Sequence, residues 1–125
     1  MPKIIKSFAY AFNGLYGTFH SELSFRVEVF ALLPVVAVGL YVGLSVLEWS
    51  LIIFAMGFVL VAELFNTAVE RLGDEAAHGQ HNGLVKKAKD VSAAAVLLSI
   101  LTALVIGILF LIIPLVRQIV GLLRQ

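Results

Sequence analysis

The chain has 125 residues, of which 61% are apolar and only 14% are charged, and its mean hydropathy is +1.03. Soluble domains average about 45–50% apolar and about 25% charged residues, so this composition excludes a water-soluble fold. The formal net charge of +1 excludes a general attraction to nucleic acid, and the absence of cysteine excludes disulfides, thiolate metal sites and cysteine nucleophiles.

An amphipathic stretch opens the chain and predicts a helix over about 3–20. Its apolar residues recur at helical spacing, at Ile4 or Ile5, Phe8, Phe12, Leu15 or Tyr16, and Phe19. Lys3 and Lys6 lie among its polar residues. A helix of this kind lies in the membrane interface, either as a plain anchor or with a chemical role.

Three stretches without charge follow, at Val29–Leu47, Trp49–Ala62 and Val91–Val116. The first and third are long enough for a bilayer core that needs roughly 20 apolar residues, but the second is too short alone. It spans only if its helix continues through Glu63 and Glu70. We therefore expect one domain over 1–125 with membrane-spanning helices at about 28–47, 49–72 and 90–114, an all-α membrane protein without an inter-domain linker.

Basic residues indicate the orientation of these helices. With a cytoplasmic N-terminus, the inside segments hold Lys3, Lys6, Arg26, Arg71, Lys86, Lys87 and Lys89, and the outside holds only Arg117 and Arg124. The positive-inside rule favours this arrangement. No cleavable signal peptide is expected, because the first long apolar run starts near residue 29 and is long enough to stay as an anchor. The segment after Pro114 could form a short helix on the far surface.

Small residues predict close helix contacts. Gly39 and Gly43 form one pair at four-residue spacing, and a second set lies near one face of the third helix, at Ser92, Ala95, Ser99 and Ala103. Helices associate in lipid through close packing at such residues. The pattern does not distinguish contacts within a chain from contacts between subunits.

Four polar residues share one stripe of the second helix: Glu63, Asn66, Glu70 and Asp74. At about 100° per residue they fall within roughly 80° of one another. A carboxylate at the bilayer centre costs on the order of 2.5–3.5 kcal/mol. Glu63 and Glu70 are therefore expected near the cytoplasmic edge or in contact with a cation or partner; the structural alternative is pairing with Arg71 or Lys89.

Lys86-Lys87-Ala88-Lys89-Asp90 begins the third helix, where Asp90 suits an N-cap and free amides could receive a phosphate. These lysines could equally be topology determinants only. Upstream, Glu22, Arg26 and Glu28 fall at the same cytoplasmic level. Carboxylates and lysines at one depth indicate a site for magnesium and a polyphosphate.

Common nucleotide-binding motifs are missing. Neither G-x-x-x-x-G-K-[ST] nor G-x-G-x-x-G occurs, so a bound nucleotide would use neither a P-loop nor a protein-kinase fold. Asp74, His78 and His81 have a spacing compatible with a metal site, but loop histidines near one acid are more often solvated.

The string Glu63-Leu64-Phe65-Asn66-Thr67-Ala68-Val69-Glu70, with Asp74 following, resembles E-x-x-N-[ST]-A-[IV]-E-x-x-x-D, the signature of the prokaryotic diacylglycerol kinase and undecaprenol kinase family. The match extends to Glu22-x-x-Phe25-Arg26-x-Glu28 upstream and to Ala88-Lys89-Asp90 and Ala93-Ala94-Ala95-Val96-Leu97 downstream. It covers the chain from Lys3 to about Ile112. Several motifs in the right order make the resemblance specific.

The resemblance implies a homotrimeric helical bundle in the inner (cytoplasmic) membrane, with a surface helix, three membrane-spanning helices and sites shared between subunits. It implies transfer of the γ-phosphoryl of magnesium-ATP to a lipid hydroxyl. Glu63 would be the general base with Asn66 in support, and Glu22 and Glu70 would hold Mg²⁺. The nucleotide would contact Tyr10, Glu22, Glu70, Lys89, Asp90 and, among Gly79, Gln80 and His81 of the loop, His81. The lipid would contact Lys3, Arg26, Glu28, Glu63 and Ala94.

The lipid alcohol stays open between diacylglycerol, which would give phosphatidic acid, and undecaprenol. Glu28 beside Arg26 resembles the diacylglycerol-type members and favours the first. Two other classes of function compete: an oligomeric ion channel or transporter lined by Glu63 and Glu70, and a structural membrane protein. Neither explains why Glu22 and the pair Lys89 and Asp90 accompany the acidic stripe.

Overall fold

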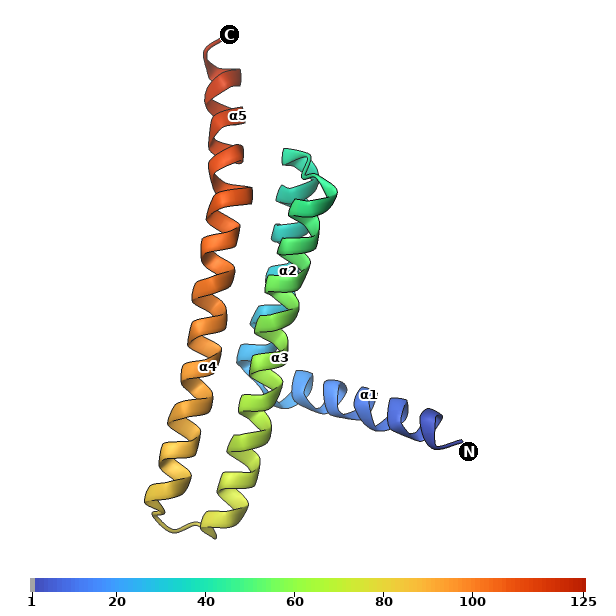
Figure 1. Ribbon diagram of the computed structural model, residues 1–125, viewed down its shortest axis with the longest axis vertical. Helices are drawn as coiled ribbons and strands as arrows, with labels where there is room; N and C mark the ends of the chain where they lie inside the picture. Colours follow the sequence, from blue (N-terminus) through green and yellow to red (C-terminus); the bar gives the residue numbers. More distant parts are fainter. Residues whose placement is uncertain (1) are drawn as a thin grey trace.

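A computed structural model describes residues 2–125. Helices follow one another along the chain as α1 (Lys3–Ser21), α2 (Leu23–Val42), α3 (Val46–Ala77), α4 (Gly83–Gly107), the π-helix η1 (Ile108–Ile112) and α5 (Ile113–Leu123). Helices α2, α3 and α4 lie alongside one another, and α1 projects sideways from them (Figure 1). The residues described contain no strand, so the all-α prediction is confirmed.

Three helices are long and apolar enough to cross a membrane: Leu23–Val42, Val46–Ala77 and the continuous rod Gly83–Leu123. Helix α3 does continue through Glu63 and Glu70, as a spanning helix there requires. Its 32 residues correspond to about 48 Å at 1.5 Å per residue, against a hydrocarbon core of about 30 Å. The acidic stripe therefore lies on the end of α3 that extends toward the polar loop.

The last rod is longer than expected, because α5 continues the direction of α4 (Figure 1) instead of lying separately on the far surface. Its 41 residues correspond to about 60 Å. Pro114 has no N–H to donate, and the widened turn of η1, where the Ile113 N–H donates to the Ile108 carbonyl, carries the helix past it. Gln118 Nε2 then donates to the Val42 carbonyl at the end of α2, at 3.0 Å.

Local caps define the corners between helices. Gly43 ends α2 at φ 78°, a left-handed conformation that glycine adopts readily. Ser45 and Glu48 then form a reciprocal capping box at the start of α3. At the opposite end, the Asn82 side chain caps α4 by accepting from the Leu84 and Val85 N–H groups at 3.0 and 3.2 Å.

Two of the predicted small residues, Gly39 and Ser99, serve contacts within the chain. A Cβ on Gly39 would lie 2.6 Å from the Trp49 ring, so glycine lets α2 approach α3. Ser99 is fully buried, and α3 with α4 forms the most extensive helix pair. Gly43 acts as a helix cap and not as a packing residue.

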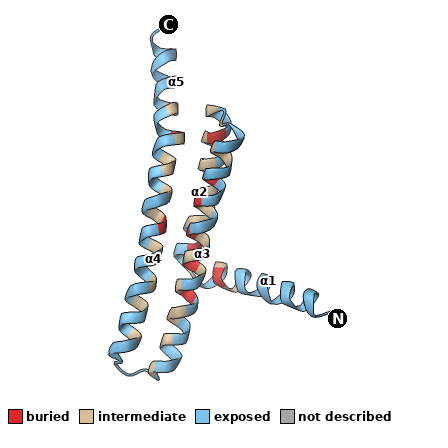
Figure 2. Cartoon of the chain, viewed as in Figure 1, coloured by how far each residue is buried: buried red, intermediate tan, exposed pale blue. Residues whose placement is uncertain are grey.

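Few side chains are buried in the single chain (Figure 2). The buried apolar ones are Phe25, Ile52, Ala55, Val59 and Leu111. Large apolar side chains cover much of the outside of α2, α3 and α4 instead. Such surfaces suit lipid or neighbouring subunits, and the trimer and the interfacial placement of α1 stay predictions.

Candidate functional site

Glu63 is the most buried carboxylate among residues 2–125, with 5% of its surface exposed. Ser24, near the start of α2, donates its hydroxyl to Glu63 Oε1. A buried carboxylate is costly without hydrogen bonds, so this contact between α2 and α3 stabilises its position.

Glu28 lies one helical turn after Ser24 on the same face of α2. Its carboxylate is within electrostatic range of Glu63. Its Oε2 atom is buried and has no hydrogen-bond partner within the described part of the chain. Two carboxylates therefore stand together, one held by Ser24 and the other with a free oxygen.

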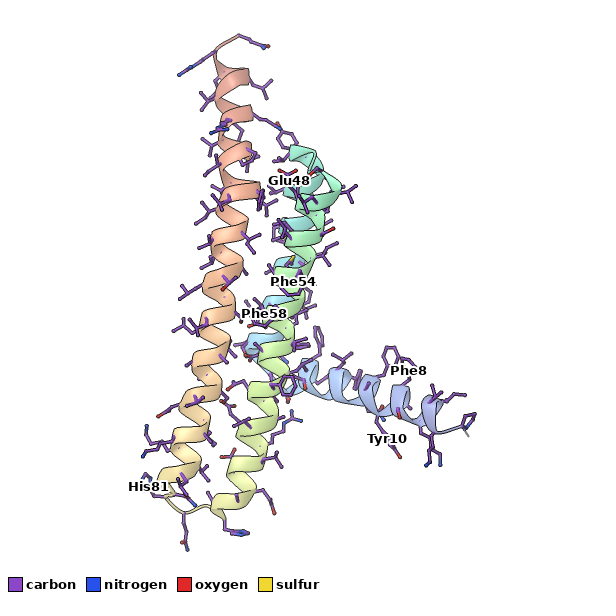
Figure 3. The ribbon with its side chains drawn as sticks, viewed as in Figure 1. Phe8, Tyr10, Glu48, Phe54, Phe58 and His81 are labelled. Atoms are coloured by element: carbon purple, nitrogen blue, oxygen red, sulfur yellow. The ribbon has the colours of Figure 1, made fainter. Side chains whose placement is uncertain are left out.

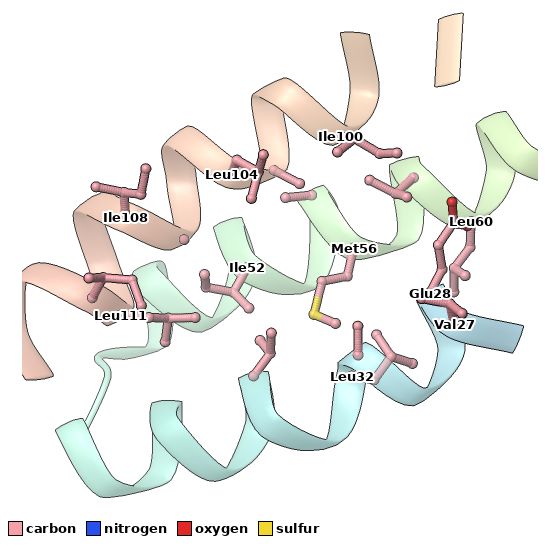
Figure 4. A pocket seen from close by; sticks show the side chains of 17 residues that line it. Val27, Glu28, Leu32, Ile52, Met56, Leu60, Ile100, Leu104, Ile108 and Leu111 are labelled. Atoms are coloured by element: carbon pink, nitrogen blue, oxygen red, sulfur yellow. The ribbon is translucent and has the colours of Figure 1, made fainter. Parts of the chain in front are cut away.

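An apolar cavity of about 380 Å³ lies between α2, α3 and the α4–η1 rod. Glu28 is the one charged side chain that lines it, close to Leu60 at one end, while Ile108 and Leu111 lie at the other (Figure 4). Glu63 follows Leu60 by less than one turn on α3. The Glu28 carboxylate thus lies at one end of a hydrocarbon-lined space, the end toward Glu63.

Asn66 links α3 to α4 one turn beyond Glu63. Its Nδ2 donates to Glu70 Oε1 at 3.5 Å, and its Oδ1 lies 2.7 Å from the Ser92 hydroxyl. The same hydroxyl lies 2.9 Å from the Lys89 carbonyl, so its single proton serves one acceptor at a time. Asn66 orients one oxygen of Glu70 through this network.

Lys89 reaches across from α4 to pair with Asp74 on α3. Gly73 makes this approach possible, because a Cβ there would lie 3.0 Å from Lys89 Cε and 2.9 Å from Val85 Cγ1. Asp90 pairs with Lys86 at 2.7 Å within α4. The expectation that Asp90 caps the helix is wrong, because α4 begins at Gly83 and Asn82 supplies the cap.

Glu22 occupies the corner between α1 and α2 and pairs with Arg71 of α3 at 3.5 Å. Arg71 also donates to the Ser21 hydroxyl at 2.6 Å. Glu22 is therefore attached to the part of α3 that carries Glu70, the residue before Arg71. The side chains predicted to hold Mg²⁺ come from the same level of the fold.

The remaining predicted residues are spread more widely. Tyr10 lies on the projecting α1 and is 71% exposed, whereas His81 lies in the loop between α3 and α4 (Figure 3). Lys3 and Ala94 are exposed. Arg26 donates to the Phe19 and His20 carbonyls at 3.2 and 2.8 Å and so holds the end of α1. One chain does not bring Tyr10 and His81 together.

The donor set suits magnesium in chemistry. Mg²⁺ prefers oxygen ligands, keeps several waters and is commonly held by one or two carboxylates together with substrate phosphates. Glu22 and Glu70 supply such carboxylates, although no cluster of three or more metal-ligating side chains exists among the residues described. The Arg71 and Ser21 contacts of Glu22 both involve its Oε1 atom.

Sequence reasoning missed Ser24, and it named Ser92 only as a small residue at a helix contact. Each contacts a predicted site residue across a helix interface, Ser24 at Glu63 and Ser92 at Asn66. A partial signal for Ser24 existed, because it precedes Glu28 by one turn. Nothing in the sequence gives the register of α2 against α3, which decides that contact.

Comparison with known proteins places these residues in a family context. The family model described as prokaryotic diacylglycerol kinase matches residues 9–111. Undecaprenol kinase of Bacillus subtilis is 34% identical over 109 residues, covering 87% of this chain and 88% of that protein. Diacylglycerol kinase of Escherichia coli K12 is 31% identical over 103 residues, covering 82% and 84% of the two chains. Diacylglycerol kinase of Synechocystis is 30% identical over 119 residues, covering 95% and 68%.

Proposed function

Because the chain belongs to the prokaryotic diacylglycerol kinase family, we propose that it transfers the γ-phosphoryl group of ATP to the primary hydroxyl of diacylglycerol, giving phosphatidic acid. The broader assignment, a membrane lipid kinase acting on diacylglycerol or undecaprenol with ATP as co-substrate, follows from the family and its named members. The particular lipid is the proposal.

One observation carries the proposal: the Glu28 carboxylate lines one end of an otherwise apolar cavity, and the buried Glu63 lies within electrostatic range of it. A lipid alcohol needs hydrocarbon surroundings for its chain and a proton acceptor at its hydroxyl. From Ile100 to Ile112 the cavity wall extends about 18 Å, comparable with the roughly 15 Å of one leaflet's hydrocarbon. The cavity therefore suits a chain that stays within one leaflet.

Glu63 is the proposed general base. Its carboxylate would take the proton of the lipid hydroxyl as that oxygen bonds to the γ-phosphorus, and the bond to the bridging β–γ oxygen would break to release ADP. Glu63 is buried, and the Ser24 hydroxyl fixes one of its oxygens. The base is thus held in place before the lipid binds.

Phosphoryl transfer otherwise requires positioning and positive charge. Lys89 would contribute a cation toward the nucleotide, with Asp90, Tyr10 and His81 as further contacts and Lys3, Arg26 and Ala94 on the lipid side. Glu22 and Glu70 would hold magnesium, which when bound neutralises charge on the phosphate oxygens. Asn66, through its bond to Glu70 Oε1, would keep that carboxylate oriented.

Orientation and assembly complete the proposal. We infer an inner-membrane protein with a cytoplasmic N-terminus, because the lysines of the α3–α4 loop region and of α1 would then all face inside. A homotrimer would cover exposed apolar faces of α2 to α4. It would also bring α1 of one subunit toward the site of another, which would allow Tyr10 and His81, separated within one chain (Figure 3), to serve one nucleotide.

Undecaprenol is the second candidate, favoured by the 34% identity to the Bacillus subtilis undecaprenol kinase. Glu28 beside Arg26 and a cavity of about 380 Å³ favour diacylglycerol.

The test is transfer of labelled γ-phosphate from magnesium-ATP by purified protein, with diacylglycerol and undecaprenol offered side by side in matched micelles. We expect diacylglycerol to be phosphorylated at least about tenfold faster, a difference of about 1.4 kcal/mol in activation free energy. The reverse ranking would identify undecaprenol as the substrate. Absence of label in both lipids would contradict the kinase assignment and favour an ion path or a structural role for the acidic stripe.

A further inference from the structure

Ser24 lies where α2 passes the buried carboxylate of α3. Its hydroxyl donates to Glu63 Oε1, and this is the one side-chain hydrogen bond that reaches Glu63 from within residues 2–125. The two residues are 39 positions apart in sequence. The contact therefore depends on how α2 packs against α3 and does not follow from local structure.

The second oxygen of Glu63 is in a different state. No hydrogen bond from the described residues reaches Oε2, and unlike Glu28 Oε2 it is not among the fully buried atoms without a partner. Glu63 Oε2 consequently keeps some accessibility although the residue as a whole is buried. One oxygen is held by Ser24, and the other has no hydrogen-bond partner within the described residues.

Glu28 explains why Glu63 needs to be held. The two carboxylates repel each other in surroundings that are largely apolar. Without a donor, the Glu63 side chain gains by rotating away from Glu28. A hydroxyl donor at Oε1 opposes that rotation.

Hydrogen bonds to α1 fix the segment of α2 that carries Ser24. Arg26 donates to the Phe19 and His20 carbonyls, and the Glu22 N–H donates to the Thr18 carbonyl, so the start of α2 is tied to the end of α1. Ser24 makes no other side-chain hydrogen bond within the described chain. Its hydroxyl is thus committed to Glu63.

We propose that Ser24 is a positioning residue that holds Glu63 Oε1 and so leaves Oε2 as the atom that accepts the proton of the lipid hydroxyl. This inference rests on the proposed function, in which Glu63 is the base. The O–H bond of the alcohol breaks and its proton moves to Oε2. The alcohol oxygen bonds to the γ-phosphorus, and ADP leaves with the electron pair of the β–γ bridge.

The test compares Ser24→Ala and Ser24→Thr with wild type in the labelled-phosphate assay. Loss of a hydrogen bond to a charged group predicts a kcat for Ser24→Ala about tenfold below wild type, with KM for magnesium-ATP and for diacylglycerol within about twofold. Threonine keeps a hydroxyl at the same atom position and should restore most of the kcat. Ser50→Ala is the matched control, because Ser50 donates only to the Val46 carbonyl of its own helix.

A double variant separates positioning from general damage. In the Glu63→Gln background, Ser24→Ala should lower the residual rate by less than about twofold, because the group it positions is already lost. An unchanged kcat in Ser24→Ala, a threonine variant as slow as the alanine one, or a full tenfold loss in the Glu63→Gln background would each overturn the proposal. A wild-type protein that phosphorylates neither lipid would instead overturn the proposed function.

Discussion

Three of the four polar side chains of the α3 stripe contact partners on other helices. Glu63 accepts from Ser24 of α2, Asn66 contacts Ser92 of α4, and Asp74 pairs with Lys89 of α4. The structural alternative, in which Arg71 or Lys89 neutralises Glu63 or Glu70, is not what the described residues show, because Arg71 pairs with Glu22 and Lys89 with Asp74. Neither Glu63 nor Glu70 pairs with a basic side chain within the described residues, so both carboxylates stay available for the proposed roles.

Glu63→Gln tests the base directly. Glutamine keeps the shape of the side chain and an oxygen for Ser24 but accepts a proton poorly, so kcat should fall about 10²- to 10⁴-fold while ATP binding stays largely intact. The measurement is labelled-phosphate transfer together with equilibrium binding of magnesium-ATP. Glu75→Gln, an exposed change on the same helix, is the control. If Glu63→Gln keeps more than about a tenth of the wild-type kcat, Glu63 is not the general base.

Glu70→Gln tests the division of labour along the stripe. Removing one proposed magnesium ligand should raise KM for magnesium-ATP by about tenfold or more in addition to lowering turnover. Titration of Mg²⁺ at fixed ATP should show a matching rightward shift. Equal loss of nucleotide binding in Glu63→Gln and Glu70→Gln would contradict the separate roles.

At the scale of elements, the corner between α1 and α2 depends on Arg26. Its two bonds to the last carbonyls of α1 satisfy groups that a helix end leaves without partners. Arg26→Ala should lower the free energy of unfolding by about 1–2 kcal/mol and should speed amide hydrogen exchange at the end of α1. Lys6→Ala, exposed on the same helix, should change neither. If amide exchange is unchanged in Arg26→Ala, Arg26 does not stabilise the corner, and only its proposed contact with the lipid remains.

The start of α4 provides a second test at this scale. Asn82→Ala removes the cap and should cost about 1 kcal/mol, whereas Asp90→Ala removes an exposed pair with Lys86 and should cost less than about 0.5 kcal/mol. Unfolding of each variant by denaturant in the same detergent gives the comparison. A larger effect at Asp90 would mean that α4 begins there in solution.

At the scale of the whole molecule, the sequence predicts the features that depend on hydrophobicity and residue spacing. The uncharged runs predict three spanning helices, and the acidic stripe follows from its spacing on one helix. The sequence predicts the helix ends less well, because capping residues outside the apolar runs determine them. These residues are Gly43, Ser45 and Asn82. The structure of the tail also does not follow from the sequence. A proline inside a helix usually ends it, but the π-helix η1 lets the last helix continue past Pro114.

Spacing predicts that helices approach at small residues such as Gly39, but it does not predict which polar side chains meet across the interfaces. The motif brings Glu63 and Asn66 to one face, but the rotation and register of α2 and α4 decide that Ser24 and Ser92 meet them. The cavity likewise arises from the spacing of α2 and α4 over α3, which no single segment encodes. Residues that act across an interface therefore emerge only from the fold.

The cavity yields a prediction that involves all of these helices. Gly107 lines it beyond Ile100, about 10 Å farther along the rod, and a Cβ there would meet nothing within 4 Å. Gly107→Leu should therefore fill the deep end without disturbing the backbone. If the lipid chain occupies the cavity, KM should rise about tenfold for long-chain diacylglycerol and little for a dioctanoyl form, with KM for ATP unchanged. Gly57→Leu, equally free of close neighbours but outside the cavity, is the control. If both variants raise KM equally, or if Gly107→Leu raises KM equally for the long-chain and the dioctanoyl lipid, the acyl chain binds outside this cavity.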